Sequence, residues 1–433
     1  MIGAIRRAFS TPDLRNKLLF TLGIIVIFRL GSFIPSPGID YEKVQQCVAS
    51  PQLNEGGFAM INLFSGGALL QLSIFALGIM PYITASIIVQ LLRVVIPRFE
   101  SLHKEGASGQ AKLTQYTRYL TIGLAVLNST TLVATVESGA LFGSVQGCTD
   151  LIVNNTWWGL TVIVLTLTAG TGLIMWLGEQ ITEHGVGNGM SILIFTSVAS
   201  AFPSSLGAIL REQGVDVFLI VIAVGLVLVA LVVFVEQSQR RIPVQYAKRM
   251  VGRRMFGGTS TYIPIKVNMA GVIPVIFASS VLYLPSLIAQ FFDPQSQWVE
   301  WINTYFTRGD HPIYIACYAV LVIFFSYFYV AITFNPEEVA DNMKKYGGFI
   351  PGIRAGRPTA DYLSYVLSRI NFPGSLYLAF VALIPLIALV LINANQNFPF
   401  GGTSLLIIVG VGLETVKQID AQMQQRHYEG LLR

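Results

Sequence analysis

The fold is decided by residues 216–236, which read DVFLIVIAVGLVLVALVVFVE, and by the basic loop that follows them. About 20 consecutive apolar residues are enough for a helix to cross the hydrocarbon core of a bilayer. The loop, residues 239–266, contains no acid and these cations: Arg240, Arg241, Lys248, Arg249, Arg253, Arg254 and Lys266. It can simply hold topology, since cytosolic loops are rich in Lys and Arg. Because its charge is so concentrated, we favour a platform for a large anionic partner, such as ribosomal RNA or an acidic motor protein.

The composition indicates an integral membrane protein. Hydrophobic residues make up 53% of the 433 residues and charged residues 12%, about half the charged fraction of a soluble domain. Because a lone strand leaves its amides unpaired in hydrocarbon, the apolar runs predict helices. We expect ten of them, near residues 17–35, 70–92, 118–137, 157–177, 190–204, 216–236, 268–291, 313–333, 372–393 and 403–419. The predicted fold is an all-α integral membrane protein with ten transmembrane helices.

The distribution of Lys and Arg predicts which side each loop faces. Cations gather before the first expected span, after the second, sixth and eighth, and in the tail. The opposite side carries only Lys43, Arg211 and Arg308. We therefore expect both termini to be cytoplasmic, with an N-terminal segment that is not cleaved. One short loop disagrees, since residues 176–190 contain acids but neither Lys nor Arg.

Ten spans divide into two sets of five. Because each set has an odd number of spans, a second copy of the first half would enter the membrane inverted. Inverted repeats place a pathway at the interface between the two halves. We expect an N-terminal half at 1–204, a hinge at 205–215 and a C-terminal half at 216–433, with cytosolic loops at 237–267 and 334–371. The two halves show no convincing residue-level similarity, so this pseudo-symmetry follows from the count of spans.

One hydrophobic segment is too long for one span and too short for two. It begins near Phe58, runs past Leu92 and is interrupted by Gly66 and Gly67. Glycine pairs are natural breaks in a helix. We expect a half-helix at 58–65 that enters the membrane and stops, with the true span starting near Leu70. The half-helix is either a re-entrant stopper beside a wet cavity or an amphipathic helix on the outer surface.

Six stretches of the chain closely resemble the SecY family, which forms the channel of the bacterial protein translocase. They are residues 75–83 (FALGIMPYI), 176–183 (WLGEQITE), 239–249 (QRRIPVQYAKR), 266–274 (KVNMAGVIP), 351–354 (PGIR) and 400–404 (FGGTS). The resemblance covers essentially the whole chain in order. It implies a channel in the plasma membrane that passes unfolded secretory proteins across and releases transmembrane segments sideways.

The resemblance also implies a closed pore. Its waist is a ring of aliphatic side chains from several helices, which corresponds here to Ile79, Ile83, Ile194, Ile276 and Ile407. Such a ring can dewet and block ions. The half-helix corresponds to the plug on the external side of the ring, with the residues Phe58, Asn62, Leu63, Phe64, Ser65, Gly66 and Gly67. A substrate would displace this plug.

The family opens sideways at a lateral gate between the second and third spans and the seventh and eighth. The polar residues expected there are Thr84, Gln90, Asn128 and Asn268. Between helices in lipid each polar contact contributes about 0.6–2 kcal/mol, weak enough for a signal sequence to break. Each residue could equally form a single interhelical hydrogen bond that has no gating role.

The resemblance assigns partners to the cytosolic loops. Contacts with the SecA ATPase and the ribosome are expected at Arg240, Arg241, Lys248, Arg249, Arg354 and Arg357. Ala355 stands where the family usually has proline, which puts the shape of that loop in doubt. The small subunits SecE and SecG, nascent chains and membrane lipids are the other implied partners.

No enzymatic motif, cofactor site or metal-ligand spacing is found, so we expect no enzyme. Two other functions compete with that of a channel. A secondary transporter would need paired acids in mid-membrane, whereas the charges near membrane depth are Arg29 and Glu414, both near helix ends where they can snorkel. A scaffold for ribosomes would explain the basic loops but not the glycine-broken segment.

Cysteine placement suggests a disulfide. Cys47 and Cys148 both fall in expected exterior loops, where oxidation is permitted, while Cys317 lies inside the eighth span. The two exterior cysteines either pair or are unrelated surface thiols.

Overall fold

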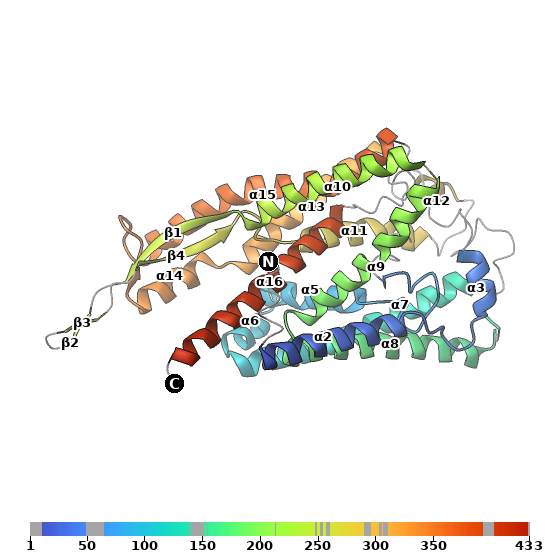
Figure 1. Ribbon diagram of the computed structural model, residues 1–433, viewed down its shortest axis with the longest axis horizontal. Helices are drawn as coiled ribbons and strands as arrows, with labels where there is room; N and C mark the ends of the chain where they lie inside the picture. The colour runs from blue at the N-terminus through green and yellow to red at the C-terminus, as the bar shows by residue number, and fades with distance from the viewer. Residues whose placement is uncertain are drawn as a thin grey trace.

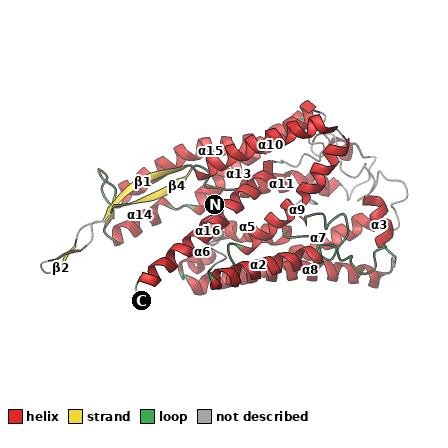
Figure 2. Ribbon diagram, viewed as in Figure 1, coloured by secondary structure: helices red, strands yellow, loops and turns green. Residues whose placement is uncertain are grey.

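The computed structural model describes residues 11–48, 65–137, 139, 151–153, 155–212, 214–246, 249–251, 254–256, 260–289, 296–302, 305, 311–392 and 402–431. Helices dominate these ranges, and the strands gather at one end of the molecule (Figure 2). The helices that overlap the predicted spans are α2 (Pro12–Gly31), α5 (Met80–Val95), α7 (Ala107–Glu137), α8 (Trp157–His184), α9 (Gly189–Glu212), α10 (Gly214–Gln237), α11 (Ile273–Ala289), α13 (Pro312–Thr333), α15 (Arg357–Ile392) and α16 (Gly402–Leu431). Shorter helices are α3 (Tyr41–Val48), α6 (Pro97–Lys104), α12 (Gln297–Ile302) and α14 (Pro336–Lys345).

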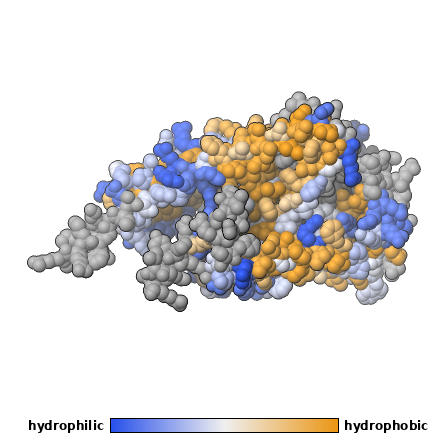
Figure 3. Space-filling view, viewed as in Figure 1, coloured by the Kyte–Doolittle hydropathy of each residue, from blue (hydrophilic) through white to orange (hydrophobic). Residues whose placement is uncertain are grey.

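Length and hydropathy identify membrane-crossing helices in the described part of the chain. Five meet both criteria, and six do if α5 and α6, which meet at a sharp bend, form one span. α10 shows why: it is apolar all round, and Leu219, Leu226 and Phe234 point outward. A helix of this kind is stable where lipid takes the place of water. Figure 3 shows the resulting hydrophobic belt across the middle of the molecule, with polar residues toward the ends.

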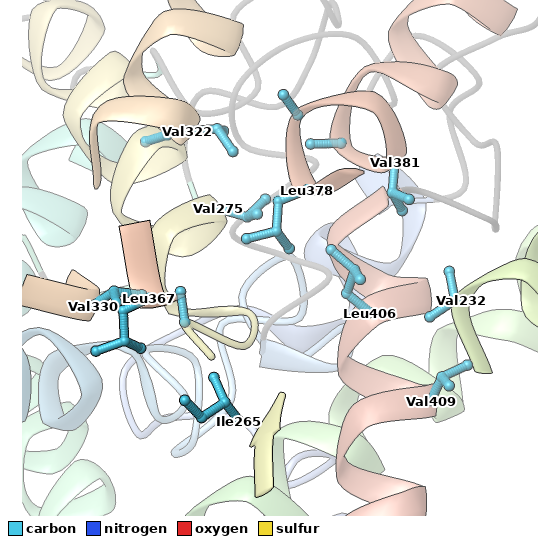
Figure 4. Close-up of a cluster of buried hydrophobic side chains, with 14 of the residues drawn as sticks. Val232, Ile265, Val275, Val322, Val330, Leu367, Leu378, Val381, Leu406 and Val409 are labelled. Atoms are coloured by element: carbon cyan, nitrogen blue, oxygen red, sulfur yellow. The ribbon is translucent and has the colours of Figure 1, made fainter. Parts of the chain in front are cut away.

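The helices lie in two groups (Figure 1). α2, α5, α7 and α8 occupy the lower side of the view, and α10, α13 and α15 the upper side. Between the groups, α9 packs against both α10 and α16, so it joins the first half of the chain to the second. Figure 4 shows the core of the second group, where Val275, Leu378 and Leu406 meet from three helices.

The link between the two halves of the chain is shorter than expected. Most of the predicted hinge at 205–215 is helical, because α9 continues past Pro203 to Glu212 and α10 begins at Gly214. Gly214 has a φ of +84°, the left-handed conformation that glycine adopts without steric cost. The chain therefore reverses between two helix ends rather than through a long loop.

The start of the second span was predicted wrongly. Residues 65–79 form a series of turns, and the helix expected near Leu70 begins at Met80. Positive φ angles at Gly66, Gly67, Gly78 and even Leu72 prevent a continuous helix. The segment is apolar because it is buried in protein. The main-chain amide of Ile74, for example, donates to Ile34 at 2.9 Å. A β-carbon on Gly170 would lie 2.1 Å from the carbonyl oxygen of Ile74.

The basic loop is a β-hairpin, which the sequence analysis did not predict. β1 (Gln239–Tyr246) pairs antiparallel with β4 (Ser260–Lys266) and with the short β5 (Gly348–Phe349). β2 (Arg249–Val251) and β3 (Arg254–Phe256) pair beyond them. Ile242 and Val244 point inward from β1, so the hairpin is anchored to the core of the second group.

Candidate functional site

An apolar cluster forms where the two groups of helices meet. Ile276 of α11 and Ile407 of α16 are buried in one cluster with Val198 of α9, and Ile83 of α5 and Ile194 of α9 pack against it. The cluster therefore draws side chains from both halves of the chain. Of the five predicted ring residues, two belong to this cluster and two pack against it.

The fifth predicted ring residue, Ile79, lies one turn away. It precedes the first residue of α5, is 2% exposed, and its carbonyl accepts from the Ile83 amide at 3.1 Å. Ile83 and Ile194 pack against both its cluster and the one containing Ile276. The five isoleucines are thus continuous through shared neighbours. Branched apolar side chains in this arrangement can exclude water and ions while offering a passing chain nothing to bind.

The break in the hydrophobic segment is held by a cation. The Arg29 guanidinium Nη1, from α2, donates to the Gly66 carbonyl oxygen at 3.0 Å. The Arg29 guanidinium carbon also lies 5.2 Å from the centroid of the Phe33 ring. Arg29 therefore points back into the protein, where snorkelling to the surface was expected. Phe58, Asn62, Leu63 and Phe64 lie outside the described residues.

Ser65, Gly66 and Gly67 are described, and they form a tight turn. The Ser65 hydroxyl is buried and accepts from the Leu69 amide at 3.1 Å. Gly66 and Gly67 have φ angles of +66° and +90°. These two positions require glycine for backbone reasons, as the broken hydropathy pattern suggested.

The four residues expected at the lateral gate have different environments. Thr84 donates to the Met80 carbonyl in its own helix at 2.9 Å, Gln90 is half-buried and Asn128 is exposed. Asn268 is buried, and its amide donates to the Glu236 carboxylate at 2.6 Å. Asn268 therefore joins α10 to the start of α11 within the second half instead of reaching α5 or α7.

The basic platform is built on the three-stranded sheet. Arg240 and Arg241 are exposed on β1, and Arg241 lies over the Tyr262 ring of β4 with 4.8 Å between guanidinium carbon and centroid. Pairing of β1 with β5 brings the segment after β5 to the same end of the molecule. Arg354 is exposed in the loop there, and Arg357 is exposed at the first residue of α15. Arg249 is the first residue of β2, and Lys248 lies outside the described residues.

An ion pair that the sequence did not predict involves an acid of the loop at residues 176–190, which contains neither Lys nor Arg. Arg118 of α7 and Glu179 of α8 form a bidentate contact, with both N–O distances at 2.8 Å. Glu179 thus neutralises a cation of the loop after the second predicted span, which the predicted topology places on the same side of the membrane. The two residues are 61 positions apart, and no local pattern connects them.

Two of the three cysteines lie in the described residues. Cys47, buried in α3, is disulfide-bonded, and Cys317 in α13 is a free thiol. Cys148 lies outside the described residues. Within the described ranges, no group of three or more His, Cys, Asp or Glu side chains could hold a metal ion.

Known proteins resemble this chain over its full length. The family model SecY matches residues 73–416. A protein translocase subunit SecY from Streptomyces galbus is 65% identical over 438 residues, with both chains fully covered. One from Mycobacterium bovis is 56% identical over 444 residues, again with both chains fully covered.

Two solved structures share the fold at low sequence identity. One, in which the plug domain of SecY is described as stabilising the closed translocation channel, superposes with a TM-score of 0.61 at 17% identity, covering 94% of this chain and 92% of the other. An idle yeast Ssh1 complex bound to the 80S ribosome superposes with a TM-score of 0.63 at 15% identity, covering 93% and 89%. With the family match and these relatives over its full length, the chain belongs to the SecY family.

Proposed function

We propose that this chain is a protein-conducting channel that passes unfolded secretory proteins across the plasma membrane and releases transmembrane segments into it. The observation that carries the proposal is the apolar cluster between the two groups of helices, because both halves of the chain contribute to it. In the proposed channel this cluster is the constriction of the pore. A constriction shared between halves opens when the halves separate. A carrier of small solutes would instead need a polar binding site at this depth.

The closed state has two barriers in this proposal. The ring is Ile79, Ile83, Ile194, Ile276 and Ile407, and residues 58–67 are the plug on its external side. Burial of Ile276 and Ile407 and the fixed turn at Gly66 support both assignments. A signal sequence opens the lateral gate between α5 and α7 on one side and α11 and α13 on the other, and the plug moves away.

The chain has no catalytic role of its own in this proposal, so partners supply the energy. SecA hydrolyses ATP, or a translating ribosome pushes the nascent chain. The exposed cations Arg240, Arg241, Arg354 and Arg357 support docking, because ribosomal RNA is held mainly through its phosphates. Both termini and the basic platform lie in the cytoplasm, and SecE and SecG complete the complex.

Ion conductance tests the channel. The purified chain with its SecE subunit is placed in planar bilayers and compared with a variant that lacks residues 58–67. We expect the intact protein to be silent and the deletion variant to show large, flickering conductances. If neither conducts, even with a signal peptide added, the channel proposal is wrong and an occluded carrier becomes the better explanation.

We further propose that Cys148 is the disulfide partner of Cys47. The bonded state of Cys47 and the free thiol of Cys317 support this pairing in a chain of three cysteines. It would tie α3 to the segment that follows α7 on the oxidising side of the membrane. Mass spectrometry of the unreduced protein should find one cross-linked peptide containing both residues. Alkylation of both thiols without reduction would contradict the assignment.

A further inference from the structure

Arg29 is an unusual residue because it is a cation inside an apolar helix. It lies near the end of α2 and is half-buried between Phe33 and the turn at Gly66. Among the described residues no carboxylate forms an ion pair with it. A charged side chain at such depth is expensive and usually has a function. Its hydrogen bond to a neutral carbonyl is charge-assisted, which makes it stronger than an ordinary one.

Gly66 fits a seat formed by two helices. A β-carbon on Gly66 would lie 2.9 Å from the Arg29 guanidinium Nη1, 3.1 Å from the Ser197 α-carbon and 3.2 Å from the Ser200 hydroxyl oxygen. A β-carbon on Gly67 would have no such neighbour within 4 Å. Gly66 is therefore docked between α2 and α9, whereas Gly67 is open on its side-chain face.

The seat shares α9 with the constriction. Ser197 is fully buried, and Ile194 and Val198 contribute to the apolar cluster. Residues three and four apart lie on neighbouring parts of one helix face. Movement of α9 that widens the constriction therefore also moves the seat of Gly66.

We propose that Arg29 is a positioning residue that latches the closed channel, by holding the Gly66 carbonyl in the seat on α9. The inference rests on the proposed plug, of which residues 65–67 are the base. While the hydrogen bond persists, the base of the plug stays docked. When a translocating chain displaces α9, the seat opens and the carbonyl leaves the guanidinium.

The first test is the conductance of Arg29→Met with the SecE subunit in planar bilayers. Methionine keeps an apolar stem but removes every donor. Loss of one hydrogen bond to a charged group should raise the open-to-closed ratio about 10-fold to 100-fold. Arg29→Lys, which keeps a charge and a donor, should leak less than Arg29→Met. Arg211→Met, at an exposed position near the end of α9, is the matched control and should stay silent.

A second pair of variants leaves Arg29 intact. Gly66→Ala and Gly67→Ala impose similar backbone strain, since both residues have positive φ angles. Only the added methyl at Gly66 meets the seat, so Gly66→Ala should conduct at least several-fold more than Gly67→Ala. Equal conductance of the two variants would contradict the docking of Gly66 between α2 and α9 as the basis of the latch.

The outcomes separate the latch from the channel itself. If Arg29→Met stays silent while deletion of residues 58–67 conducts, the latch is wrong and the channel stands. If Arg29→Met leaks but Arg29→Lys leaks equally, a hydrogen bond to Gly66 is not what holds the plug. If no variant conducts, the proposed function fails with the latch.

Discussion

Replacing Ile407 with alanine should open the channel without a substrate. Ile407 is 2% exposed and lies in the apolar cluster that both halves share, so its side chain is shielded from water. In the proposed channel it meets water when the pore opens. The substitution removes three carbon atoms, at about 0.8 kcal/mol each, or about 2.4 kcal/mol in total. That loss should raise the open-to-closed ratio about 50-fold.

The matched control is Leu378→Ala in the core of the second half. Leu378 is fully buried in a cluster formed by the second half of the chain alone. We expect its contacts to persist when the halves separate, so its loss should lower the melting temperature without causing a leak. Single-channel recording of both variants measures the difference. Equal leakage from the two variants, or a silent Ile407→Ala channel that is correctly folded, would refute the assignment of Ile407 to the ring.

Three further predictions concern contacts seen in the structure. A double-mutant cycle with Arg118→Met and Glu179→Gln should give a coupling free energy of about 1 kcal/mol in thermal unfolding, because the ion pair is bidentate but partly exposed. Zero coupling would mean that the pair does not tie α7 to α8. Arg241→Ala should weaken ribosome binding and lower the slope of log affinity against log salt by about one, whereas an unchanged slope would remove Arg241 from the platform. Gly170→Ala should destabilise the protein by about 1–3 kcal/mol, since its β-carbon would lie 2.1 Å from a main-chain oxygen. The control Gly172→Ala, whose β-carbon would lie 3.6 Å from its nearest neighbour, should be nearly neutral in the same melting experiment.

Hydropathy located the helices well but could not distinguish burial in protein from burial in lipid. Residues 216–236 and 65–79 are both apolar, yet the first is the outward-facing helix α10 and the second a buried series of turns. Both environments select the same side chains. The glycine pair correctly marked the break, but the positive φ of Leu72 carries no sequence signal.

The site was harder to predict because its contacts are distant in sequence. Nothing local distinguishes Ile276 or Ile407 from other isoleucines, and family resemblance alone indicated them. Arg29 and Gly66 are 37 residues apart, so the arginine was read as snorkelling to the surface. The hairpin could have been found, since polar residues flank Ile242 and Val244 in alternation. Pro243 is tolerated between them because β1 pairs there with β4 alone, and β5 joins only at Gln245 and Tyr246.

A final prediction concerns the ring and the latch together, because α9 contributes to both. α9 contributes Ile194 to the constriction and the backbone of Ser197 to the Gly66 seat, so one displacement disturbs both. Two contacts couple energetically when the loss of one loosens the other, and α9 gives these two a shared support. If Arg29→Met already loosens α9, Ile407 packs less tightly in the closed state and its truncation costs less. The double variant Ile407→Ala with Arg29→Met should therefore raise the open-to-closed ratio by less than the product of the two single effects, in the same bilayer recordings. A fully multiplicative result would mean that α9 does not couple the latch to the ring.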